Sequence, residues 1–168
     1  MPAKNMCIAA LAIAFCATSS LAATPIPSCT DPAYRGFDFW LGDWNVHKSD
    51  GALAGHNRIT REYNGCVIHE HYTTEHGYSG ESLNIYDASR KVWHQTWVDN
   101  RGLLLLLDGG LHDGAMVLEG RTSNAAGIVV RQRITWTPNQ DGSVRQLWET
   151  AEGAGEWNVA FDGTYTKK

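Results

Sequence analysis

Phe37-Asp38-Phe39-Trp40-Leu41-Gly42-Asp43-Trp44 is the stretch of this 168-residue sequence that decides the fold. It joins a cluster of aromatic side chains to a Gly-x-Trp sequence, and only short strand-like segments follow it. An aromatic segment that leads directly into β-strands is typical of the start of a small antiparallel barrel. Because Thr30 or Asp31 can cap a helix that has Pro32 in its first turn, we expect a short helical turn through Phe39.

The rest of the chain consists of β-strand candidates separated by turns. Segments rich in Val, Ile, Thr, Trp and Tyr alternate with pairs such as Asp50-Gly51 and Asp141-Gly142, which favour β-hairpins. Strands are expected at residues 43–49, 55–63, 66–75, 79–87, 91–99, 102–108, 114–122, 127–137, 142–150 and 156–166. Because closing a sheet removes its exposed edges, the sequence predicts an all-β, antiparallel up-and-down barrel of about ten strands. A two-sheet sandwich is the alternative.

Residues 1–23 are predicted to be a secretory signal peptide. They carry Lys4 near their start, continue with an apolar stretch over 7–17 and end in the small residues Ala22 and Ala23, the pattern that signal peptidase recognises. The apolar stretch is too short to span a bilayer, and no later segment is apolar enough to do so. We therefore expect one barrel domain over 24–168 that is periplasmic or secreted.

Two cysteines, Cys29 and Cys66, remain after removal of the predicted leader. In an oxidising compartment a lone pair of cysteines most often forms a disulfide. A reactive thiol pair is the alternative, but the chain has no Cys-x-x-Cys motif to favour it. The sequence therefore predicts a Cys29–Cys66 disulfide that ties the segment before the aromatic stretch to the start of a strand.

Composition argues against a nucleic-acid partner. The chain has 14 Lys and Arg against 18 Asp and Glu, a formal net charge of −4 with neutral histidines, and no basic stripe interleaved with aromatic residues. Its seven tryptophans indicate an aromatic core or a lined cavity instead.

The sequence resembles calycin-type barrels, the grouping that includes lipocalins, fatty-acid-binding proteins and nitrobindins, and in particular a bacterial family of secreted calycin-like domains. The similarity covers nearly the whole chain after the leader. It is carried by residues 37–44 with their Gly42-Asp43-Trp44, and by 64–66, 78–82, 93–99 and 161–165. The resemblance implies a calycin-like barrel but no activity, since one fold hosts many functions. Haem binding is not expected, because haem ligation in nitrobindins comes from the C-terminal part and no histidine follows His112.

Side-chain alternation indicates what the barrel could hold. Every second side chain of a strand shares a face, so 91–99 and 142–150 each place tryptophan and glutamine together. The sequence leaves open which face points inward. We hypothesise a cavity for a small aromatic or amphipathic molecule. Its expected lining residues are Trp44, Glu70, Trp93, Gln95, Trp97, Gln146 and Trp148. The alternative is that these side chains only fill a narrow barrel.

Proton-transfer chemistry is a second hypothesis. Glu70 paired with His94 or Tyr72 could serve a cofactor-free isomerase or lyase. The alternative, which the sequence favours, is that Glu70 forms an ion pair with Arg131 or Arg133 across neighbouring strands.

Metal binding is a third hypothesis. His69 and His71 are two residues apart on one predicted strand, a spacing that suits a metal, and a carboxylate with His76, His94 or His112 could complete the ligand set. Solvent-facing histidines are the favoured interpretation, so the sequence assigns no metal site and no cofactor.

The sequence thus predicts an exported barrel that binds a small molecule. A cofactor-free isomerase or lyase, and a metal-binding or structural envelope protein, are the alternatives.

Overall fold

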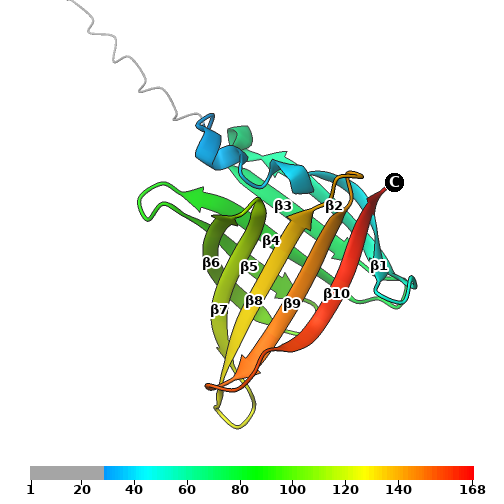
Figure 1. Ribbon diagram of the computed structural model, residues 1–168, viewed down its shortest axis with the longest axis vertical. Coiled ribbons are helices and arrows are strands. Elements are labelled where there is room, and N and C mark those ends of the chain that lie inside the picture. The colour runs from blue at the N-terminus through cyan, green and yellow to red at the C-terminus, as the bar shows by residue number, and fades with distance from the viewer. Residues whose placement is uncertain (1–28) are drawn as a thin grey trace, which may run out of the picture.

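The computed structural model describes residues 29–168 as a closed barrel of ten antiparallel strands (Figure 1). The strands are β1 (Gly42–Lys48), β2 (Leu53–Glu62), β3 (Val67–Thr73), β4 (Ser79–Asp87), β5 (Val92–Asp99), β6 (Leu104–His112), β7 (Ala115–Ser123), β8 (Val129–Pro138), β9 (Val144–Glu152) and β10 (Asn158–Lys167). Each strand pairs with its neighbours in sequence, and β1 pairs with β10 to close the barrel. The predicted up-and-down barrel is therefore confirmed and the sandwich is wrong. The predicted signal peptide lies outside the described residues.

The observed strand ends differ from the predicted ones most clearly at β6. The sequence predicted a strand that ends at residue 108, but the strand continues to His112. Gly109 is needed inside the strand, since a Cβ there would lie 2.0 Å from the Val117 carbonyl oxygen. The turn that follows is at Asp113-Gly114, one of the Asp-Gly pairs that the sequence predicted as a hairpin turn, and both residues have positive φ, as a tight hairpin requires.

The single helical turn that the sequence predicted is two short 3₁₀ turns, η1 (Pro32–Arg35) and η2 (Asp38–Trp40). Asp31 caps η1, because its Oδ1 accepts a hydrogen bond of 2.9 Å from the Ala33 amide. These turns lie across one end of the barrel, at the top of Figure 1.

Two fully buried rings of this segment, Phe37 and Trp40, form what we call the aromatic plug. They stack on each other with centroids 4.8 Å apart, and Phe37 meets Trp136 edge-on at 5.1 Å. Trp40 also packs against Trp136 at 5.3 Å. The plug therefore fills the apolar core at this end of the barrel.

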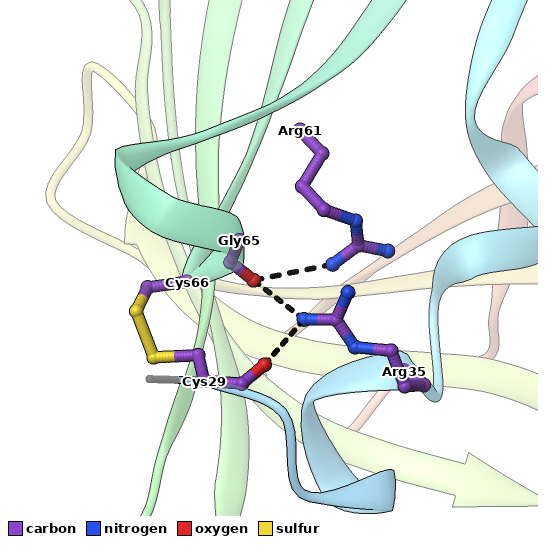
Figure 2. Close-up of a disulfide and its surroundings, with 5 residues drawn as sticks. All are labelled: Cys29, Arg35, Arg61, Gly65 and Cys66. Carbon is purple, nitrogen blue, oxygen red and sulfur yellow. Dashed lines mark hydrogen bonds between the residues drawn. A yellow bond between two sulfur atoms is a disulfide. The ribbon is translucent and has the colours of Figure 1, made fainter. Parts of the chain in front are cut away.

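The predicted Cys29–Cys66 disulfide is present and fastens the segment before the plug to the connection between β2 and β3 (Figure 2). That connection contains the short turn η3 (Tyr63–Gly65). Nη2 of Arg35 donates 2.6 Å hydrogen bonds to the carbonyls of both Cys29 and Gly65, and Arg61 donates to the same Gly65 carbonyl at 3.2 Å. One covalent bond and a shared guanidinium bridge thus hold the segment in place. Within residues 29–168, no helix is long and apolar enough to cross a membrane.

Candidate functional site

A cavity of about 210 Å³ lies inside the barrel, toward the end opposite the aromatic plug, and opens to solvent there. Its lining combines aromatic and aliphatic side chains with carboxyl, carboxamide and phenol groups, and both kinds occur on the same strands, as with Gln95 and Trp97 on β5. The lining residues are Glu70, Tyr72, Tyr78, Gln95, Trp97, Leu105, Ile134, Trp136, Gln146, Trp148, Ala160, Phe161 and Tyr165.

The structure brings most of the predicted lining residues together. Glu70, Gln95, Trp97, Gln146 and Trp148 line the cavity. Trp44 and Trp93 face the interior but lie in the closed half of the barrel. The Trp93 ring packs edge-on against Phe37 at 5.8 Å, and Trp44 Nε1 donates a 2.9 Å hydrogen bond to the Trp40 carbonyl. These two tryptophans therefore belong to the core around the plug.

Sequence reasoning missed several lining residues on β8 and β10. The alternation that joins Trp136 to Ile134 was visible, but nothing indicated that this face points inward. On β10 the pairing register with β9 shifts between Val159 and Phe161. This β-bulge interrupts the alternation, and both Ala160 and Phe161 line the cavity.

Glu70 is the centre of a buried polar network on the inner faces of β2 to β5. Its Oε1 accepts a hydrogen bond of 2.6 Å from Asn57 Nδ2, and its Oε2 accepts one of 2.6 Å from Ser82 Oγ. Asn84 donates to Ser82 Oγ at 2.9 Å, and Gln95 donates to Asn84 Oδ1 at 2.8 Å. The chain of amides and hydroxyls fixes the Glu70 carboxyl group against the cavity wall.

The expected ion pair between Glu70 and Arg131 or Arg133 is wrong. Both arginines lie on the outer face of β8, where Arg133 pairs with Glu149 at 3.0 Å and Arg131 donates to the Gly155 carbonyl at 2.7 Å. Their side chains alternate with the inward Gln132 and Ile134. The sequence pattern showed this alternation but not which of the two faces is internal.

The suggested pairing of Glu70 with His94 is also wrong. His94 points away from the barrel interior, and its Nδ1 lies 2.8 Å from Asp108 Oδ1 while Nε2 lies 3.0 Å from Thr96 Oγ1. Tyr72, the other suggested partner, does line the cavity beside Glu70.

Burial controls the protonation of the cavity. Removal from solvent raises the pKa of Glu70 to about 7, although the hydrogen bonds from Ser82 and Asn57 act in the opposite direction. Burial, and then the nearby Glu70 charge, raise the pKa of Tyr72 to about 12 and that of Tyr165 well above its ordinary value. At neutral pH the Glu70 carboxyl group is therefore present in both its protonated and its ionised form, whereas the phenols of Tyr72 and Tyr165 stay neutral.

Glu70 is expected to make the protein less stable as the pH rises. Its ordinary pKa of 4.5 applies to the unfolded chain, so between pH 4.5 and about 7 the folded state holds a proton that the unfolded state has released. The stabilisation is complete below pH 4.5 and is lost as the pH rises through 7, a change of about 3 kcal/mol. Glu70→Gln removes this titration because a carboxamide does not ionise in this pH range. The new side chain can still be hydrogen-bonded, since its amide oxygen can accept from Asn57 and its amide N–H can donate to Ser82.

Urea unfolding of both proteins at pH 5 and pH 8 measures the effect. We expect the wild type to lose about 2–3 kcal/mol relative to Glu70→Gln over this interval. Parallel pH profiles for the two proteins would show that Glu70 titrates at an ordinary pKa.

No protein-family model matches this chain, and no curated protein is significantly similar to it.

Proposed function

We propose that the protein is an exported calycin-type barrel that binds a small aromatic or amphipathic molecule in the cavity. The observation that carries the proposal is a cavity open to solvent whose lining combines aromatic and aliphatic side chains with polar groups held by hydrogen bonds, such as Glu70. Ligand sites combine these two features, since apolar contact provides affinity and a few convergent polar groups provide orientation. The disulfide is compatible with an oxidising compartment such as the periplasm.

The cavity volume limits the size of the ligand. About 210 Å³ is below the roughly 300–1,000 Å³ of pockets for drug-sized molecules. A molecule with one ring, or two small fused rings, and a short polar substituent matches this space. Its ring would pack against the indoles of Trp97 and Trp148, and its polar end would meet Glu70, Gln95 or Gln146.

A matched pair of variants at the open end tests the proposal. Ala160 lines the mouth of the cavity and is exposed, so Ala160→Phe places a ring across the opening without changing the buried core. Ala154→Phe adds the same ring to the exposed β9–β10 connection, outside the cavity lining. Tryptophan fluorescence is measured while each protein is titrated with a panel of single-ring and short amphipathic compounds.

At least one compound is expected to change the fluorescence of the wild type and of Ala154→Phe in a saturable manner. Ala160→Phe should weaken that binding at least about tenfold, because the added ring occupies part of the small cavity. Equal affinity in all three proteins would place the binding elsewhere. Absence of any saturable change across the panel would contradict a binding cavity.

Proton transfer is a second candidate function, favoured by one observation. Glu70 lines the cavity with a pKa of about 7, where a carboxylate works well as a general base at neutral pH. The phenol of Tyr72 beside it could return a proton to the substrate, as in a cofactor-free isomerase or lyase. An enzyme releases an altered product, whereas a binding protein returns the same compound. Glu70→Gln would abolish turnover while the compound still binds.

A further inference from the structure

Two imidazoles and two carboxylates meet on the outer face of β2, β3 and β4, away from the cavity. His69 and His71 are separated by one residue on β3, and their ring centroids lie 3.9 Å apart. Glu62 reaches them from β2 and Glu81 from β4. We refer to Glu62, His69, His71 and Glu81 as the outer His–Glu cluster.

We propose that the outer His–Glu cluster binds a divalent transition-metal ion of the zinc type through Glu62, His69 and His71. One ligand atom from each of these three residues lies within 4.8 Å of the others. Glu62 Oε2 and His69 Nδ1 are 3.2 Å apart. Two ligands of a tetrahedral zinc ion, with bonds of about 2.0–2.1 Å, are separated by about 3.3 Å. The Glu62–His69 pair is therefore already at a ligand–ligand distance, and the His71 ligand atom lies within 4.8 Å of both.

Glu81 is placed to orient both imidazoles. Its carboxylate lies 3.2 Å from His69 Nε2 and 3.3 Å from His71 Nδ1. Metal-bound histidines almost always donate their second ring N–H to a carboxylate, carbonyl or water. A shared bond to Glu81 would leave His69 Nδ1 and His71 Nε2 to bind the metal. Thr60 supports Glu62 in the same way, because its hydroxyl donates to Glu62 Oε1 at 2.9 Å.

The charges around the cluster favour a cation. Arg58 is the register partner of His71 on β2 and carries one positive charge beside the cluster. The carboxylates of Glu62 and Glu81 outweigh it when the imidazoles are neutral. Leu83, the register partner of His69 on β4, is apolar and offers no ligand. Three protein ligands on a partly exposed surface leave the fourth position for water, as zinc sites often do.

The ligand set differs from the one that the sequence suggested. The sequence suggested a carboxylate together with His76, His94 or His112; among residues 29–168 the carboxylate within metal-binding distance is Glu62, and none of these three histidines joins the group. The β2–β3 pairing, which places Thr60 opposite His69, brings Glu62 to this face. Residue spacing along one strand contains no information about that partner.

Calorimetric titration of the tag-free protein with Zn²⁺ tests the site. The wild type is expected to bind one Zn²⁺ per chain, and His69→Ala and His71→Ala should each weaken binding at least about tenfold. His94→Ala is the matched control, because it removes an outer-face histidine that also contacts a carboxylate, and its affinity should equal that of the wild type. Circular dichroism spectra of the four proteins establish that the fold is retained.

Co²⁺ absorption identifies the ligands independently of affinity. We expect visible bands of a tetrahedral site for the wild type, absent from His69→Ala and His71→Ala. Glu81→Gln should keep the bands, since the direct ligands remain, while its affinity falls about tenfold because the imidazoles are less well oriented. The proposal is overturned if the wild type binds Zn²⁺ no more tightly than His69→Ala, or if His94→Ala loses binding to the same extent.

Discussion

Replacing both Cys29 and Cys66 by serine is expected to lower the free energy of unfolding by about 4 kcal/mol. The bond joins residues 37 positions apart, and the chain-entropy model gives about 3.9 kcal/mol for a loop of this length. The constraint acts mainly on the unfolded chain. In the folded chain, the Arg35 hydrogen bonds to Cys29 and Gly65 still hold the segment in place.

Urea unfolding of the wild type and of the double serine variant measures this loss. The thermal midpoint should fall by about 10 °C, as expected for a domain of this size. Addition of a thiol reductant should lower the stability of the wild type to that of the variant and leave the variant unchanged. A loss below about 1 kcal/mol would mean that the unfolded chain gains little freedom when the bond is removed.

Trp40→Ala is expected to cost about 3–5 kcal/mol, the range for truncating a large buried aromatic side chain. Trp40 is fully buried and contacts Phe37, Trp136 and Tyr165 within the barrel. Its replacement would leave a cavity between the plug and the strands. The hydrogen bond that Trp44 makes to residue 40 is not lost directly, because the acceptor is the main-chain carbonyl.

Trp157→Ala is the matched control for this prediction. Trp157 is partly exposed, and the guanidinium groups of Arg131 and Arg133 lie over its ring at 4.6 and 4.2 Å. Loss of such exposed contacts costs about 0.5–1 kcal/mol each. Equal destabilisation of the two variants in urea would contradict the role of Trp40 in filling the core at this end of the barrel.

The barrel itself could be predicted from the sequence because its signals are local. Turn pairs such as Asp50-Gly51 and Asp141-Gly142 fixed where the chain reverses, and alternation fixed which side chains share a face. The strands at 79–87 and 92–99 therefore coincide with those expected at 79–87 and 91–99. A closed order of strands then follows from short connections and from the need to remove edges.

Depth along the barrel could not be predicted, because alternation gives a face but not a position along the axis. Trp93 and Trp97 share one face of β5, yet only Trp97 reaches the cavity while Trp93 packs against the plug. The partners of Glu70 were equally hidden. Asn57 and Ser82 lie on strands on either side of β3, and the stagger between the strands decides that they meet this carboxyl group.

Native mass spectrometry of the protein purified from an exporting host tests the central claim most directly. We predict that the wild type carries the extra mass of an organic molecule, distinct from that of a metal ion, which is lost on denaturation, and that the fraction of Ala160→Phe carrying this mass is much smaller because the mouth of the cavity is blocked. The same organic mass on Ala160→Phe, at the same occupancy as on the wild type, would place the bound molecule outside the cavity. A bare wild-type chain that also gives no fluorescence response to the ligand panel would contradict the proposed binding function.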